Sequence, residues 1–168
     1  MKHVKLFESW YEERLPHIQD HGDNTGTVVN DYPDADDPEK VKNSIIHAYE
    51  LASSGERVKP ILILGGSHSA MINLISSAAE AVGAKMRTVD LGGHTEPEDL
   101  DVLMAEAIPG IYCLHKIEKA SDRVIARLLY LSSNKIPAGS LFVVSGHYKV
   151  GPELSSAFGD RFKIFELL

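Results

Sequence analysis

Residues 61–79 read ILILGGSHSAMINLISSAA. Four apolar residues come first, then Gly65-Gly66, and then apolar residues at the three-to-four-residue spacing of a helix. A short apolar run bounded by glycines is typical of a buried strand, and a Gly-Gly pair is typical of a tight turn. The stretch therefore predicts a strand, a turn and a helix over about 70–82.

The same alternation continues to the end of the chain. The expected strands are 61–64, 86–91, 110–114, 140–145 and 162–167. The expected helices are 38–53, 70–82, 96–107, 119–133 and 152–158. Asp37 and Pro38 suit the N-cap and the first position of the helix that precedes the first strand. Alternating helices and apolar strands predict an α/β fold, with a parallel sheet covered on both faces.

Composition limits the function classes. The chain has 168 residues, 43% of them hydrophobic, which is enough for one domain with a core. The net charge of −7 argues against a broad nucleic-acid-binding surface. The single cysteine, Cys113, lies in an apolar run, and we expect it to be buried in a protein of a reducing compartment. With no long apolar segment and no pattern of a secretory signal, we expect a soluble cytoplasmic protein that does not bind membranes.

The first 37 residues differ from the rest. Residues 1–16 have the pattern of a short amphipathic helix, and 17–37 are rich in Asp, Gly, Asn and Pro, as in an acidic linker. A domain over 38–168 follows. We expect the aromatic residues of the first helix, Phe7, Trp10 and Tyr11, to contact a partner protein, because the linker separates them from the domain.

The turn after the first strand departs from the phosphate-binding motif G-x-x-x-x-G-K-[ST]. Gly65 is in place, but Ala70, Met71 and Ile72 stand where the motif has Gly, Lys and Ser/Thr. The lysine of that motif binds the β- and γ-phosphates, and the hydroxyl binds Mg²⁺. Met71 has no charge, Ile72 has no oxygen, and Ala70 restricts the backbone that curls around phosphate. The substitutions predict that phosphoryl transfer is lost.

Four segments, in order, resemble the large subdomain of an AAA+ ATPase, a P-loop NTPase. They are the turn just described and residues 110–133, 140–149 and 152–167. The resemblance covers about 38–168. It implies a five-stranded parallel sheet in the order 5-1-4-3-2 and no helical lid, because the sequence ends at the fifth expected strand.

The second and third segments are also altered. Residues 110–133 resemble the Walker B strand and the helix after it, with His115 and Lys116 in place of Asp and Glu. Residues 140–149 resemble the sensor-1 strand, with His147 in place of the usual Asn. Neither His115 nor Lys116 replaces a carboxylate that binds Mg²⁺ or orients water.

The fourth segment ends in Asp-Arg-Phe, as in MoxR-like and chelatase-type members. By that resemblance Arg161 is an arginine finger that acts on a neighbouring subunit. The alternative is a surface arginine paired with Asp160 or Glu153. The start of the chain, MKHVKLFESWYEE, resembles those of small proteins from large tailed bacteriophages, which adds a virion or a host cytoplasm as possible locations.

The substitutions predict a catalytically inactive protein, and the resemblance implies a subunit of a homo- or hetero-oligomer, so we expect a structural or regulatory role. We expect no cofactor and no metal. Weak binding of ATP, ADP or phosphate remains open, because a helix N-terminus still offers N–H groups to an anion. The vestigial site would comprise Gly65, Gly66, Ser67, His68, Ser69, Ala70, Met71 and Ile72, with Lys116 as a partial replacement for the missing charge.

An enzyme of a different class remains as an alternative. Gly65-Gly66-Ser67-His68-Ser69 approximates the nucleophile elbow G-x-S-x-G of α/β-hydrolases. Ser67, Asp90 and His147 would form the triad in the correct chain order. Ser69 replaces the last glycine of that motif, and the chain is short for the fold, so we favour the AAA+ resemblance.

Overall fold

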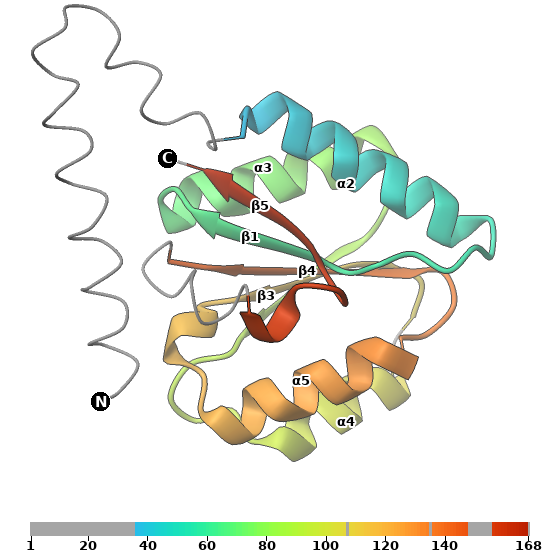
Figure 1. The fold of residues 1–168 in the computed structure, drawn as a ribbon. Helices are drawn as coiled ribbons and strands as arrows, with labels where there is room; N and C mark the ends of the chain where they lie inside the picture. The colour runs from blue at the N-terminus through green and yellow to red at the C-terminus, as the bar shows by residue number, and fades with distance from the viewer. Residues whose placement is uncertain (1–35, 107, 135, 148–155, 168) are drawn as a thin grey trace, which may run out of the picture.

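The fold is a three-layer α/β sandwich (Figure 1). The computed structural model describes residues 36–106, 108–134, 136–147 and 156–167. The predicted N-terminal helix, its three aromatic residues and the predicted linker up to residue 35 lie outside these ranges.

Helices cover both faces of the sheet (Figure 1). On one face lie α2 (Pro38–Ser53) and α3 (His68–Ala81), and on the other lie α4 (Pro97–Glu106) and α5 (Asp122–Asn134). A short 3₁₀ turn, η2 (Ile117–Lys119), precedes α5. No helix among the described residues is both long and apolar enough to cross a membrane.

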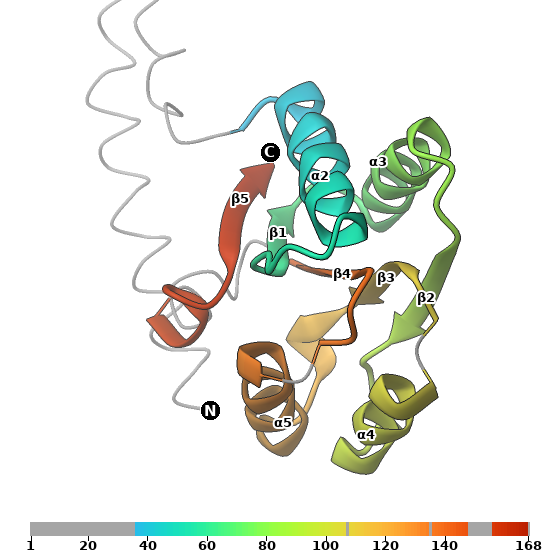
Figure 2. The ribbon, with the colours of Figure 1, turned by 90° about the vertical axis from the view of Figure 1, so that its right-hand side faces the viewer.

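The sheet has five parallel strands in the order β2-β3-β4-β1-β5. They are β1 (Ile61–Gly65), β2 (Met86–Asp90), β3 (Gly110–His115), β4 (Ser140–Gly146) and β5 (Lys163–Leu167). This is the order 5-1-4-3-2 read from the other edge, so the predicted fold class and topology are confirmed. Figure 2 shows β2 and β5 at opposite edges.

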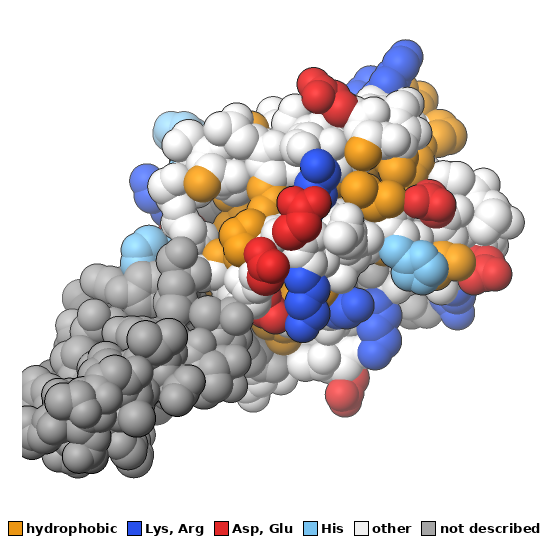
Figure 3. All heavy atoms as spheres, turned by 90° about the horizontal axis from the view of Figure 1, so that it is seen from above, with side chains coloured by type: hydrophobic (Ala, Val, Ile, Leu, Met, Phe, Trp, Pro, Cys, Tyr) orange, Lys and Arg blue, Asp and Glu red, His pale blue; other side chains and the backbone are white. Residues whose placement is uncertain are grey.

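Alternate residues of the central strands belong to two hydrophobic cores, one on each face of the sheet, because successive side chains of a strand point to opposite faces. Ile61 and Ile63 of β1 pack with α2 and α3, whereas Leu62 and Leu64 pack with α4 and α5. Cys113 belongs to the first of these cores and is fully buried, as predicted. Figure 3 shows the outer face of α2 and α3, where acidic and basic side chains are mixed.

Two helix starts differ from the sequence prediction because serines cap them. α3 begins at His68 rather than residue 70, since the Ser67 hydroxyl accepts a hydrogen bond from the Ala70 N–H at 3.1 Å. α5 begins at Asp122 rather than residue 119, since residues 117–119 form the 3₁₀ turn and the Ser121 hydroxyl accepts from the Val124 N–H. Of the helix predicted over 152–158, residues 156–158 are helical and the rest lies outside the described ranges.

The outer edge of β5 contacts Asp36, a residue that the sequence places in the linker. The Asp36 N–H donates to the Glu166 carbonyl at 2.7 Å, and the Asp36 carboxylate accepts from the Glu166 N–H at 2.8 Å. Asp37 then caps α2 by accepting from the Glu39 N–H. The chain therefore enters the domain at the β5 edge of the sheet.

Candidate functional site

The predicted site residues gather where the carboxyl ends of β1, β3 and β4 meet. Ligands of open α/β sheets bind at this edge, outside the carboxyl ends of the strands. Here the loops enclose a cavity of about 190 Å³. It is lined by Gly65, Gly66, Ser67, His68, Met71, Lys116, Glu118, Lys119, Ser145, Gly146 and His147.

The Gly65-Gly66 turn has a structural role of its own. Both residues have positive φ, +99° and +69°, which glycine adopts without strain. A Cβ atom at Gly65 would collide with the backbone carbonyl oxygen of Leu167 in β5, whereas one at Gly66 would meet only the Leu167 side chain, at 3.9 Å. The fold therefore requires Gly65 whether or not a phosphate binds.

The three altered motif positions lie at the start of α3. Ala70 is exposed, whereas Met71 is 3% exposed and packs in the core beneath α2 and α3. Ile72 is half-buried against the same core. Together with Ser67, His68 and Ser69, which are exposed, they leave this loop without a charged ammonium group.

Lys116 lines the cavity, and its ammonium group forms an ion pair. Its Nζ lies 3.0 Å from Asp90 Oδ2, across the β2–β3 pair. Lys116 is also the one non-glycine residue with positive φ, +64°, among the described residues. The Gly92 N–H, followed by the Lys116 ammonium, holds the pKa of Asp90 below its usual range. The predicted replacement charge is therefore already engaged by a carboxylate.

His115 lies against His68. The ring centroids are 4.7 Å apart and the rings are tilted by 49°. His115 Nδ1 is buried and has no hydrogen-bond partner among the described residues. Burial, followed by the neighbouring His68, lowers the pKa of His115. Its imidazole is therefore neutral at pH 7, which leaves this position without a permanent charge.

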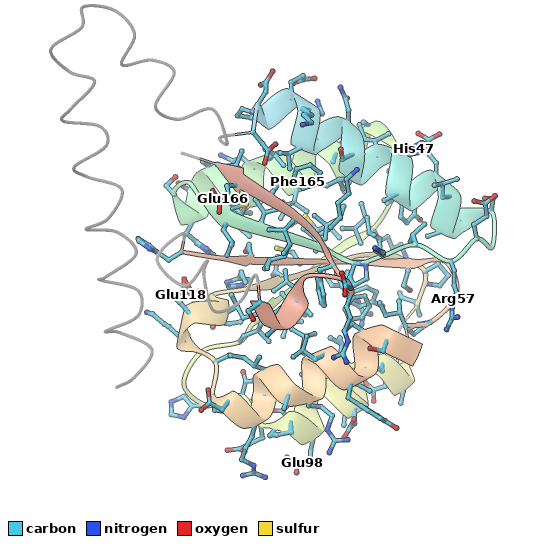
Figure 4. The ribbon with its side chains drawn as sticks, in the orientation of Figure 1. His47, Arg57, Glu98, Glu118, Phe165 and Glu166 are labelled. Carbon is cyan, nitrogen blue, oxygen red and sulfur yellow. The ribbon has the colours of Figure 1, made fainter. Side chains whose placement is uncertain are left out.

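Glu118 and Lys119 also line the cavity, although neither was among the site residues predicted from the sequence. Glu118 Oε1 accepts a hydrogen bond from the His147 N–H at 3.2 Å and so joins η2 to the end of β4. In Figure 4, Glu118 lies at the same end of the molecule as Glu166, and Arg57 lies at the opposite end. Both residues lie in the segment 110–133 that resembles Walker B, but that resemblance did not indicate that they line the cavity.

No group of three or more His, Cys, Asp or Glu side chains in the described part of the chain is arranged to hold a metal ion.

The residues proposed for a hydrolase do not assemble as a triad. The Ser67 hydroxyl caps α3, and the Asp90 carboxylate accepts from the Gly92 N–H at 2.7 Å and from Lys116. Asp90 ends β2 and His147 follows β4, with β3 between them. Two strand spacings, about 10 Å, separate these chain positions. The geometry therefore favours a degenerate phosphate loop over a nucleophile elbow.

Arg161 lies far from the cavity. It is exposed, and it precedes β5, whose first residue Lys163 is in register with Ile61 at the start of β1. The phosphate loop follows the other end of β1, about 15 Å away at 3.3 Å per residue. Among the described residues, which include Asp160, the Arg161 guanidinium has no ion-pair partner. Glu153, the other predicted partner, lies outside these residues. The arrangement excludes action on the cavity of the same chain.

Several solved structures share this fold. The Holliday junction branch migration motor RuvB of Thermotoga maritima superposes with a TM-score of 0.56 at 20% identity, over 77% of this chain and 44% of that chain. A DNA polymerase III gamma subunit-related protein of T. maritima gives 0.54 at 13% identity, over 79% and 46%. PCH-2 of C. elegans gives 0.58 at 13% identity, over 78% and 42%.

These likenesses confirm the fold of the large AAA+ subdomain. The chain spans less than half the length of these solved structures. No protein-family model matches the sequence. No curated protein matches it either.

Proposed function

We propose that this chain is an AAA+-like domain that does not hydrolyse ATP and that serves as a structural or regulatory subunit of a larger assembly. The observation that carries the proposal is the absence of the motif lysine at the phosphate loop. Cations positioned around the phosphates of a nucleoside triphosphate stabilise the charge that develops during phosphoryl transfer. At this loop the lysine position is the buried Met71, and Lys116, one of the two lysines that line the cavity, is paired with Asp90 at 3.0 Å.

The metal position supports the same conclusion. The ions of active P-loop enzymes are held by a hydroxyl and a carboxylate, which here are replaced by Ile72 and His115. His115 instead packs on His68. The cavity of about 190 Å³ is also below the roughly 300 Å³ at which pockets for small organic ligands begin.

A role on a partner subunit is consistent with Arg161. An arginine supplied from one subunit to the active site of the next stabilises transition-state charge. Arg161 is exposed, has no ion-pair partner in the described part of the chain, and cannot reach its own loop. We propose that it contacts a neighbouring subunit in a homo- or hetero-oligomer, where its replacement by alanine would change the ATPase rate of an active partner.

The test of the proposal is phosphate release from Mg²⁺-ATP by the purified chain. We expect no release above background. A matched pair of variants separates real turnover from a contaminant: Ser67→Asp keeps a helix cap but places a carboxylate in the loop, whereas Ser67→Asn keeps the cap without charge. Turnover that Ser67→Asp abolishes and Ser67→Asn preserves would refute the proposal.

A further inference from the structure

One edge of the sheet is open. Immediately before β2 the Lys85 carbonyl accepts from the Ile111 N–H, and immediately after it the Leu91 N–H donates to the His115 carbonyl, so odd-numbered residues bond to β3. Because bonding alternates along a parallel strand, Met86 and Thr88 direct their N–H and C=O groups away from the sheet. No strand in the described part of the chain pairs with this outer edge, which lies opposite β5 (Figure 2). At its carboxyl end the Thr95 hydroxyl donates to the Asp90 carbonyl at 2.7 Å.

The surroundings of the edge are exposed and basic at one end. Lys85, Arg87, Thr88 and Asp90 are all exposed. Lys85 and Arg87 place two positive charges at the amino end of β2, and Asp90 at the carboxyl end is neutralised by Lys116. An open edge of this kind accepts an extended peptide through main-chain hydrogen bonds.

The chain itself contains a segment whose composition suits an added strand at this edge. Residues 27–31 read TVVND, three β-branched residues followed by Asn and Asp, with Gly26 before them. This is the composition of a short strand. Between Leu15 and Glu39 there is no Lys or Arg, while Asp31 and Asp34 add negative charge. An orientation antiparallel to β2 brings Asp31 next to Lys85 and Arg87 and keeps it away from Asp90.

The segment cannot reach the β2 edge of its own chain. Asp36 is fixed to Glu166 on the outer side of β5. From there to a position outside β2 is six strand spacings, about 29 Å. The five residues from Asp31 to Asp36 span at most about 18 Å when fully extended.

We propose that residues 27–31 of one copy add to the outer edge of β2 in a second copy, as an antiparallel strand. Donor and receptor lie at opposite edges of the sheet, so the contact is head-to-tail. Repeated, it forms a ring or a filament rather than a closed two-fold dimer. The contact involves none of the cavity residues, so it does not depend on the proposed loss of ATP hydrolysis.

Sedimentation of the full chain tests the contact with variants of each edge. Thr88→Pro blocks the receptor edge, yet leaves the β2–β3 bonds intact because the Thr88 N–H points outward. Thr88→Ala is its control. V28P/V29P blocks the donor strand, and V28A/V29A is its control. We expect the wild type to self-associate, and each proline variant to associate at least about tenfold more weakly than its alanine control.

Mixing the two proline variants gives the decisive result. Thr88→Pro retains a donor strand and V28P/V29P retains a receptor edge, so the mixture should form a one-to-one dimer and nothing larger. If two copies instead paired β2 with β2, Thr88→Pro would block association and V28P/V29P would associate like the wild type. That result would overturn the proposal. A wild type that stays monomeric up to about 100 μM would also overturn it. Far-UV circular dichroism verifies folding, and K85E/R87E replaces Thr88→Pro if that variant does not fold.

Discussion

Replacing Gly65 by alanine should destabilise the domain far more than the same change at Gly66. Both glycines have positive φ, so each alanine incurs left-handed backbone strain of about 1–2 kcal/mol. At Gly65 the new Cβ also collides with the Leu167 carbonyl oxygen, whereas at Gly66 the nearest atoms are 3.9 Å away. Relief of that collision requires β1 and β5 to separate at their carboxyl ends, where Gly65 pairs with Leu167.

The added cost of forcing atoms into packed structure is typically about 1–3 kcal/mol. We therefore expect Gly65→Ala to lower the free energy of unfolding by about 2–5 kcal/mol and Gly66→Ala by about 1–2 kcal/mol. For a domain of this size the difference corresponds to a shift in Tm of several degrees, roughly 2–4 °C per kcal/mol.

Urea unfolding without nucleotide, followed by circular dichroism, measures both values. Gly83→Ala is a further control, because φ there is +66° and a Cβ would meet nothing within 4 Å. If Gly65→Ala and Gly66→Ala had equal effects, the close approach of β5 would not explain why this glycine persists in an otherwise altered loop.

Two further predictions concern buried titratable groups. Burial raises the pKa of the Cys113 thiol to about 12. We therefore expect no reaction with a thiol reagent at pH 8 until the chain unfolds. Rapid labelling of the native protein would show that Cys113 is accessible to solvent. The pKa of His115 should lie below its ordinary value of about 6.5 in a nuclear magnetic resonance titration, and His68→Asn should raise it. Because unfolded His115 takes up a proton more readily than the folded residue, stability should fall as the pH drops below about 6.5, and His115→Gln should reduce that dependence. A His115 pKa at or above 6.5 would contradict the effect of its partial burial and of the neighbouring His68.

The sequence was sufficient to predict the five strands of the sheet and their order. Apolar runs such as ILIL at 61–64 mark strands buried on both faces, and the resemblance of four segments, three of them altered, to one family indicated the topology. Capping shifted two helix starts, because a single hydroxyl at Ser67 or Ser121 decides which N–H groups are satisfied. The run around Ser67 carries no glutamate three residues later that would mark a capping box.

The contacts of the site could not be predicted from local sequence. Lys116 and Asp90 are 26 residues apart and meet because β2 lies beside β3. The contact of His68 with His115 joins the start of α3 to the end of β3. Asp36 was placed in a linker, although it binds Glu166 at a separation of 130 residues. Each of these contacts depends on strand adjacency, which a motif implies without specifying the side chains that meet.

Calorimetric titration of the chain with ATP, with and without Mg²⁺, tests the central claim most directly. We predict no heat of binding up to about millimolar nucleotide, and no effect of Mg²⁺, because Met71 and Ile72 replace the lysine and the metal-binding hydroxyl of the phosphate loop. Ser67→Asn and Ser67→Asp should then be indistinguishable from the wild type. Micromolar binding that Ser67→Asp abolishes and Ser67→Asn retains would contradict the account and identify the chain as a nucleotide-binding subunit.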